Sequence, residues 1–246
     1  RVLFRSKLLN KNQLLYLGLP ETKASHSIYL PFISLSFGER NVSPLALLNT
    51  PVFKKRKYFA AYIASNCVNF REQYFDALVD FAKKHKLGEV HALGTCYGTH
   101  KETKRNIENA GRGSANFMDQ TVEIYKDYQF ALTAENVIKD GYITEKPASA
   151  LLAGTIPIYL GSDRIKEIID PQAMVYLKQG EDLARILLPI VSDDNSLEKM
   201  MTHPRFASEN SLYYFSWLKD VESYLTKKNM KTMSDDIRRK VTEILK

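Results

Sequence analysis

The stretch YQFALTAENVIKDGYITEKPASALLAGTIPIYLGS, residues 128–162, decides the fold. Residues 128–134 are an apolar run of strand length, residues 144–154 have the composition of a helix, and residues 155–161 are a second apolar strand. A strand, a helix and a strand in this order predict a parallel crossover. In parallel sheets ligands bind beyond the carboxyl ends of the strands, so residues 134–143 are expected to face a ligand.

The same alternation extends over the rest of the chain and predicts an α/β fold with a parallel sheet. Residues 95–120 have the composition of a long surface loop, and prolines cut the first fifty residues into short strands. Residues 41–57 mix prolines with a basic run and are expected to be a linker. Strands are expected at 14–20, 27–37, 58–65, 90–94 and 173–177, with helices over 69–86 and 162–170 and through most of the chain beyond 180.

The two cysteines, Cys67 and Cys96, show no CxxC spacing and no histidine at metal-ligand spacing. We therefore expect neither a disulfide nor a zinc site. The five histidines are scattered, so no metal-binding residue is predicted.

The chain of 246 residues carries a formal net charge of +7, and 44% of its residues are hydrophobic. A basic excess of this size fits an ordinary solvated surface, a phosphorylated ligand, nucleic acid or peripheral contact with an anionic membrane. Nucleic-acid binding is disfavoured, because the aromatic residues fall at core spacing and the basic residues are spread out. No apolar run reaches the about 18 residues of a membrane span, and Arg1–Leu9 is too charged and short for a signal peptide. A cytoplasmic location is therefore favoured if the chain is complete.

A polar cluster stands at the start of the helix predicted over residues 144–154. Thr144 is expected to cap this helix, and the free amides of its first turn together with Lys146 suit a phosphate or diphosphate. Glu145 can accept hydrogen bonds from two sugar hydroxyls, and Tyr142 offers a flat face and a hydroxyl. The cluster therefore predicts a nucleotide-sugar pocket. The alternative is structural, with Glu145 favoured by the helix dipole, Lys146 solvated and Tyr142 packed in a loop.

Arg71 lies near the start of the first long helix, just beyond the first regular strand. The helix dipole disfavours a cation at this end, so the position is better explained if Arg71 grips a bound phosphate. A solvated surface arginine is the alternative.

Taken together, these segments resemble the signature of the α1,3/4-fucosyltransferase family. That family carries a phenylalanine-rich strand, a Glu-Asn pair, the run Tyr-(Val/Ile)-Thr-Glu-Lys, a helix and a Pro-(Ile/Val)-x-x-Gly strand. The matching positions are Phe130, Glu135–Asn136, Tyr142–Lys146 and Pro157–Gly161, within a resemblance that covers roughly residues 55–220.

The resemblance implies a GT-B type glycosyltransferase, in which a Rossmann-like donor domain faces a second lobe. It implies transfer of fucose from GDP-fucose to a saccharide hydroxyl with inversion, and no cofactor beyond this donor substrate. The implied domains are a partial, divergent or truncated acceptor-side lobe at 1–50, the donor domain at 51–225 and a C-terminal helix at 226–246. The implied donor-binding residues are Arg71, Glu135, Asn136, Tyr142, Glu145 and Lys146.

The sequence departs from the family pattern at Pro147 and Val137, and above all in its first fifty residues. An inverting transfer needs a general base, which the family takes from its N-terminal lobe. Glu21 and Glu39 are the only glutamates in residues 1–50, and neither has a recognisable context, so the catalytic residue stays unassigned. The alternative function is a non-catalytic module that binds a GDP-sugar without transferring it. Acceptor, linkage position and oligomeric state are not predicted.

Overall fold

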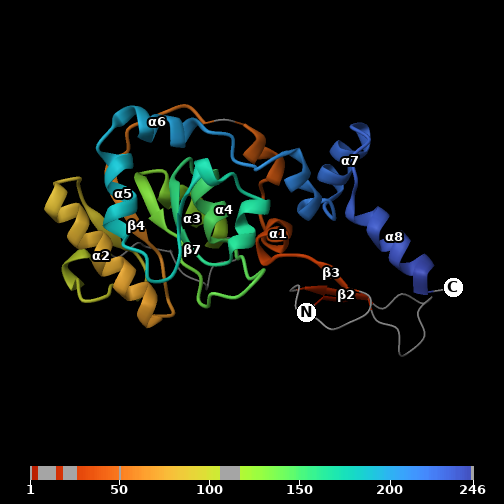
Figure 1. Ribbon diagram of the computed structural model, residues 1–246, viewed down its shortest axis with the longest axis horizontal. Helices are drawn as coiled ribbons and strands as arrows, with labels where there is room; N and C mark the ends of the chain where they lie inside the picture. Colours follow the sequence, from red (N-terminus) through yellow and green to blue (C-terminus); the bar gives the residue numbers. More distant parts are fainter. Residues whose placement is uncertain (1, 5–14, 19–26, 50, 106–116, 245–246) are drawn as a thin grey trace.

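The protein is described by a computed structural model that covers residues 2–4, 15–18, 27–49, 51–105 and 117–244 (Figure 1). Its centre is a sheet of five parallel strands in the order β5-β4-β6-β7-β8. The inner strands are buried along almost their whole length, which explains why they are continuous apolar runs rather than alternating ones. The strands are β4 (Tyr58–Tyr62), β5 (Val90–Ala92), β6 (Tyr128–Leu132), β7 (Ile156–Leu160) and β8 (Val175–Leu177).

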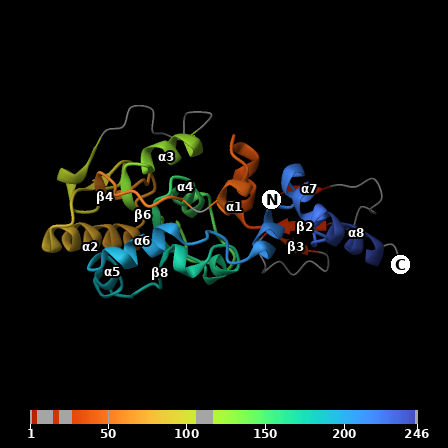
Figure 2. The ribbon, with the colours of Figure 1, turned by 90° about the horizontal axis from the view of Figure 1, so that it is seen from above.

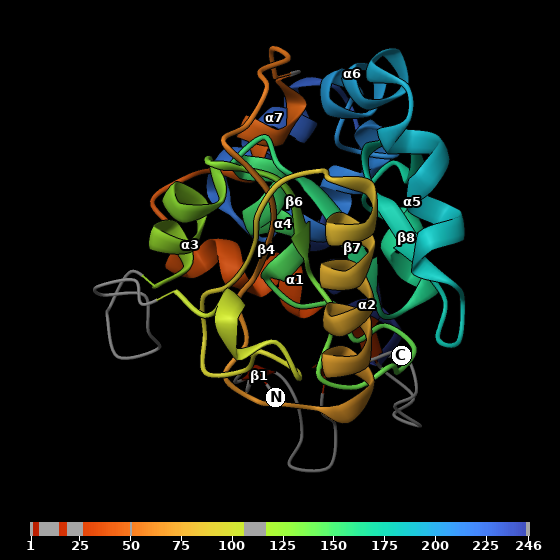
Figure 3. The same ribbon diagram turned by 90° about the vertical axis from the view of Figure 1, so that its left-hand side faces the viewer.

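Helices cover both faces of this sheet (Figures 2 and 3). On one face, α2 (Asn69–His85) and α5 (Leu183–Val191) pack on the large aromatic and aliphatic side chains of the strands, with α6 (Asp194–Thr202) beside α5. On the other face, α3 (Phe117–Tyr125) and α4 (Lys146–Leu152) pack on small residues such as Ala61 and Ala131. The predicted parallel α/β architecture is confirmed.

The strand order places a topological switch point between β4 and β6. The crossover from β4 leads through α2 to β5 at the sheet edge, and the next crossover returns through α3 to β6 on the other side of β4. The connection that leaves the carboxyl end of β4 runs towards β5, whereas the connection that leaves β6 runs the other way, towards β7. Their divergence opens a crevice between β4 and β6, which is where doubly wound sheets bind ligands.

The segment before β4 differs from its prediction. Of the strand expected over residues 27–37, only β3 (Ser27–Tyr29) is a strand, and α1 (Phe32–Ser36) follows directly after Pro31. Proline suits a helix start because its missing N–H would have no helical partner there. Beyond α1 lie the 3₁₀ helices η1 (Phe37–Glu39) and η2 (Pro44–Leu48), and β3 belongs to a small sheet with β1 (Val2–Phe4) and β2 (Leu15–Gly18).

The C-terminal part is helical as expected, although in separate pieces. The 3₁₀ helix η6 (Glu209–Phe215) precedes α7 (Lys219–Lys227) and α8 (Met233–Ile244). Met233 of α8 packs in one buried cluster with Ile28 and Leu30, which places α8 beside the small N-terminal sheet (Figure 1). The domain boundaries at residues 50 and 225 stay predictions.

Shorter turns complete the chain. The 3₁₀ helices η3 (Lys101–Thr103), η4 (Asp163–Glu167) and η5 (Pro171–Ala173) connect the strands, and Ser162 caps η4 through its hydroxyl as a helix-capping serine should. The loop expected over 95–120 ends earlier than predicted, because α3 begins at Phe117, and residues 106–116 lie outside the described ranges. In the described residues, no helix is both long and apolar enough to cross a membrane.

Candidate donor-binding site

A cavity of about 580 Å³ lies at the switch point. Its walls come from the segments just beyond the carboxyl ends of three strands and from α3 and the start of α4. The lining residues are Ile63, Ala64, Ser65, Asn66, Arg71, Leu93, Gly94, Thr95, Lys104, Arg105, Phe117, Met118, Thr121, Tyr125, Asn136, Glu145, Lys146 and Ser149. A concave site with a few convergent charged groups at this place in the fold is a ligand pocket.

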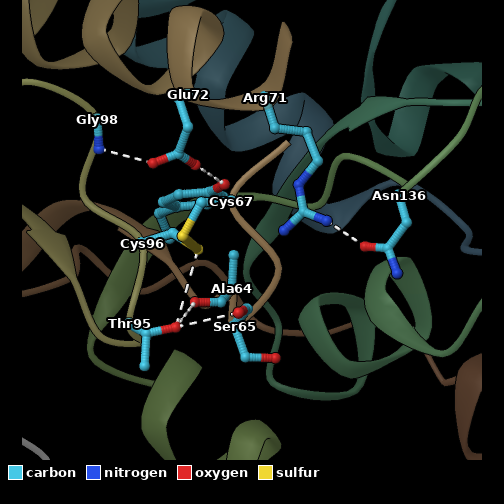
Figure 4. Close-up of a disulfide and its surroundings, with 10 residues drawn as sticks. Ala64, Ser65, Cys67, Arg71, Glu72, Thr95, Cys96, Gly98 and Asn136 are labelled. Atoms are coloured by element: carbon cyan, nitrogen blue, oxygen red, sulfur yellow. Dashed lines mark hydrogen bonds between the residues drawn. A yellow bond between two sulfur atoms is a disulfide. The ribbon is translucent and has the colours of Figure 1, made fainter. Parts of the chain in front are cut away.

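Arg71 lies in the first turn of α2 and is only 1% exposed. One of its terminal nitrogens donates a hydrogen bond to Oδ1 of Asn136, and its guanidinium lies 5.8 Å from the centre of the Tyr62 ring (Figure 4). Its Nε is buried without a hydrogen-bond partner, and within the described ranges no carboxylate forms an ion pair with it. A buried cation left in this state is suited to an anion that enters the cavity, because burial of an unpaired charge is costly.

Lys146 is held in place by Glu135. Its Nζ lies 3.2 Å from Oε2 of Glu135 and 2.8 Å from Oγ1 of Thr144, and its side chain is 16% exposed. Glu135 is fully buried and also accepts hydrogen bonds from the backbone N–H and the hydroxyl of Thr144, both at 2.7 Å. Burial raises the pKa of Glu135, and the neighbouring ammonium of Lys146 opposes that rise.

The predicted cap of α4 is wrong. Thr144 uses its hydroxyl on Glu135, and Glu145 occupies the N-cap position without a side-chain capping bond. A hydrogen bond from the threonine hydroxyl to a buried carboxylate is stronger than a helix-capping bond between neutral groups, because the carboxylate charge strengthens it.

The structure brings together four of the six residues predicted to bind the donor. Arg71, Asn136, Glu145 and Lys146 line the cavity, with Glu145 contributing its only carboxylate among the lining residues. Glu135 lies behind Lys146 and does not line the cavity. Tyr142 packs its ring edge-on against Phe32, with the ring centres 5.6 Å apart, and is not a lining residue either.

Two further cations, Lys104 and Arg105, line the cavity and were missed by the sequence analysis. They follow η3, where the backbone N–H of Arg105 donates to the carbonyl of Ala92 at the end of β5. The sequence does carry a signal for them, since two adjacent basic residues follow the strand at 90–94. The composition of residues 95–120 instead predicted one uninterrupted surface loop. Arg105 also lies 3.4 Å from a carboxylate oxygen of Glu89.

The structure does not place either glutamate of residues 1–50 at the cavity as a catalytic base. Glu21 lies outside the described residues, and Glu39 is exposed in η1 and is not among the residues that line the cavity.

The expectation that the two cysteines form no disulfide is wrong. Cys67 and Cys96 form a disulfide with their Cα atoms 5.2 Å apart (Figure 4). Their sequence separation of 29 gave no sign that the two cysteines lie close together, but β4 and β5 are neighbouring parallel strands, so the loops that follow them meet. Disulfides persist in oxidising compartments, so this bond gives no support to the cytoplasmic expectation, which stays a prediction.

Among the described residues, potential metal-ligand atoms gather at Cys67, Glu72 and Cys96, where they lie within 4.8 Å of one another. Both sulfur atoms are taken up by the disulfide, and thiolates are the form of cysteine that binds metal. This cluster therefore does not fit a metal ion.

Residues 53–241 match the model of the C-terminal region of glycosyltransferase family 10 (fucosyltransferase). The GDP-fucose protein O-fucosyltransferase 3 of Homo sapiens is 28% identical over 176 residues, which are 69% of this chain and 34% of that protein. The α-(1,4)-fucosyltransferase of Arabidopsis thaliana is 25% identical over 128 residues, which are 50% of this chain and 30% of that protein. The chain thus spans about a third of the length of these curated relatives.

A solved structure of an α1,3-fucosyltransferase with GDP-fucose is similar to the fold, with a TM-score of 0.55 and 19% sequence identity. The match covers 89% of this chain and 71% of that one. It supports the α/β fold of the GT-B type that the sequence predicted, whereas the short N-terminal lobe stays a prediction. Because the family model matches most of the chain, from the linker before β4 to the last helix, the protein belongs to glycosyltransferase family 10, the fucosyltransferases.

Proposed function

We propose that the cavity binds GDP-fucose and that the protein transfers fucose, with inversion, to a saccharide hydroxyl, as the α1,3/4-fucosyltransferases do. The observation that carries this proposal is Arg71, a buried guanidinium at a cavity wall with no ion-pair partner in the described part of the chain. A diphosphate supplies the missing negative charge.

The assigned roles follow from the chemistry of the lining. Arg71 and Lys146 hold the diphosphate, and Lys104 and Arg105 add positive charge from the opposite loop. Glu145 accepts hydrogen bonds from hydroxyl groups of the sugar or ribose, and the amide of Asn136 can donate hydrogen bonds to them. Tyr142 reaches the donor only if its ring leaves Phe32, and Glu135 acts through Lys146.

The same cations serve the reaction. In an inverting displacement the acceptor oxygen attacks the anomeric carbon, a base takes its proton, and GDP departs with the bonding electrons. Negative charge grows on the departing diphosphate, and fixed cations that face it stabilise the transition state. The base is not assigned.

The test measures GDP binding by calorimetry for the parent and for the variants Arg71→Met and Lys146→Ala. Loss of a charge-assisted contact is worth roughly 1.5–3 kcal/mol, so each variant should bind GDP about 10- to 100-fold more weakly. Arg185→Met, on the exposed side of α5, is the matched control and should bind as the parent does.

Two outcomes contradict the proposal. Unchanged GDP affinity in both folded variants rules out the diphosphate assignment, and a parent that does not bind GDP rules out the donor site. A parent that binds GDP but transfers fucose to none of a panel of saccharides and peptides supports the non-catalytic module instead.

A further inference from the structure

One wall of the cavity is made of two loops that lie against each other. These paired loops are residues 63–68, which follow β4, and residues 93–98, which follow β5. Together they contribute seven of the lining residues, from Ile63 to Asn66 and from Leu93 to Thr95. The position of one loop relative to the other therefore sets the shape of this side of the cavity.

The loops approach closely because of their sequence. The backbone N–H of Cys96 donates to the carbonyl of Ala64 at 3.1 Å, and the hydroxyl of Thr95 donates to the carbonyl of Ser65 at 3.2 Å. Gly94 makes the approach possible, since a Cβ at this position would lie 2.2 Å from the carbonyl oxygen of Ala64. Any larger residue would push the loops apart.

The disulfide is the covalent link between the paired loops, and it stands next to the lining residues. Cys67 directly follows Asn66, and Cys96 directly follows Thr95. Arg71 lies in the first turn of α2, four residues beyond Cys67, so the same link also fixes the entry of the chain into α2 (Figure 4). Glu72 adds a non-covalent brace by accepting a hydrogen bond from the backbone N–H of Gly98 at 2.7 Å.

The two cysteine residues differ in their exposure to solvent. Cys67 is an exposed residue, whereas Cys96 is 1% exposed. A thiolate from solution can reach the sulfur of Cys67 and displace the thiolate of Cys96. A second thiol of the same dithiol then releases Cys67, so two electrons and two protons pass to the protein and the reductant becomes a disulfide.

We propose that the Cys67–Cys96 disulfide is a redox control of the donor site, in which the oxidised protein holds the paired loops in the nucleotide-binding arrangement and two-electron reduction by a dithiol weakens binding. This inference rests on the proposed function, because it concerns the affinity of the same cavity. Without the link, the loops are held together by hydrogen bonds alone, and the additional ordering that binding then requires subtracts from the binding free energy.

The experiment compares GDP binding to the oxidised protein, to the protein reduced with dithiothreitol and to the double variant Cys67→Ser/Cys96→Ser. Reduction should weaken GDP binding about tenfold, the factor expected when a few side chains must be immobilised on binding. The double variant should bind as the reduced protein does and should not respond to dithiothreitol. The chain has two cysteines, so any response of the parent comes from this pair.

An effect on loop position is distinguished from an effect on folding stability by measuring GDP binding under conditions in which circular dichroism shows every form to be folded. Equal affinity of the oxidised and the reduced protein overturns the inference, whereas absence of GDP binding to the oxidised parent overturns the proposed function instead. If the reduced forms unfold, Gly94→Ala in the oxidised protein takes over the test, because it moves the loops apart with the disulfide intact. Weaker GDP binding by that variant supports the inference, and unchanged binding contradicts it.

Discussion

At the scale of single residues, Glu135 organises the site from behind. Three donors converge on its buried carboxylate, and one of them is the ammonium group of Lys146 that faces the cavity. Sequence similarity implied a direct contact between Glu135 and the donor. The structure instead suits a residue that orients Lys146 and fixes the turn at Thr144.

The raised pKa of Glu135 gives a prediction about stability and pH. Because burial raises this pKa in the folded protein above its ordinary value of 4.5, folding favours the protonated form of Glu135 more than the unfolded chain does. The stability advantage of the parent over Glu135→Gln should therefore be greatest below about pH 4.5 and should fall as the pH rises through the raised pKa. Urea unfolding of both proteins across this range measures the difference, and an advantage that grows with pH would contradict the raised pKa.

The cations of the cavity give a prediction about metals. Arg71, Lys104, Arg105 and Lys146 can neutralise a diphosphate without an ion, as fixed cations do at phosphoryl groups. We expect GDP affinity to survive treatment with EDTA. A loss of binding that added Mn²⁺ restores would show that a metal ion takes part.

At the scale of elements, α3 and α4 are tied together across the cavity by Arg40. Its side chain is fully buried and donates to the carbonyl of Met118 at 3.2 Å, to the hydroxyl of Ser149 at 2.7 Å and to the carbonyl of Glu145 at 3.4 Å. Met118, Ser149 and Glu145 all line the cavity. A residue from the segment before β4 thus fixes the distance between two walls of the site.

Arg40→Met keeps the length of the side chain and removes these hydrogen bonds. Hydrogen bonds to a charged group are worth about 1.5–3 kcal/mol, so the free energy of unfolding should fall by about that amount. Urea unfolding checks this, with Arg185→Met on the exposed side of α5 as the control that should change stability by less than about 0.5 kcal/mol. A loss no larger than that of the control would show that Arg40 does not tie the helices.

The elements that the sequence predicted correctly are those with a strong local signal. The buried strands are continuous apolar runs, and in α2 the residues Tyr74, Leu78 and Phe81 recur at helical spacing and are buried. Arg71 and Lys146 could be placed in the cavity because each lies in the first turn of a helix that follows a strand, where the parallel topology puts a ligand.

What the sequence could not give depends on contacts between distant residues. The disulfide requires that β4 and β5 be neighbours, and the orientation of Lys146 requires a carboxylate eleven residues earlier to be buried behind it. Strand spacing carries no information about either. In α1 the local signal misled, because the β-formers of residues 27–37 suit a strand, while packing of Ile33 in one buried cluster with Ile143 favours a helix.

At the scale of the whole molecule, the two ends of the described chain meet. Ile28 in β3, Leu30 just after it and Met233 at the start of α8 share one small buried cluster, so α8 begins near the small sheet (Figure 1). The central sheet lies between these two segments in sequence, so contacts at this cluster close the chain around it.

Met233→Ala tests this closure. Met233 is 1% exposed, and truncation of a buried methionine costs about 2–5 kcal/mol. The variant should lower the midpoint of urea unfolding, whereas Val52→Ala, at a site that is 87% exposed, should leave it almost unchanged. If the two variants unfold at the same urea concentration, the cluster does not hold the ends of the chain.

The disulfide has a consequence for how the protein is produced. With two cysteines the chain has one possible intramolecular pairing, so oxidation within a molecule cannot yield a scrambled isomer. The incorrect products open to these thiols are links to another molecule, because Cys67 is exposed and can be attacked by a foreign thiol. A preparation oxidised before folding is complete should therefore contain covalent dimers that run as monomers once reductant is added, and a disulfide isomerase should not be needed to correct the pairing within one chain.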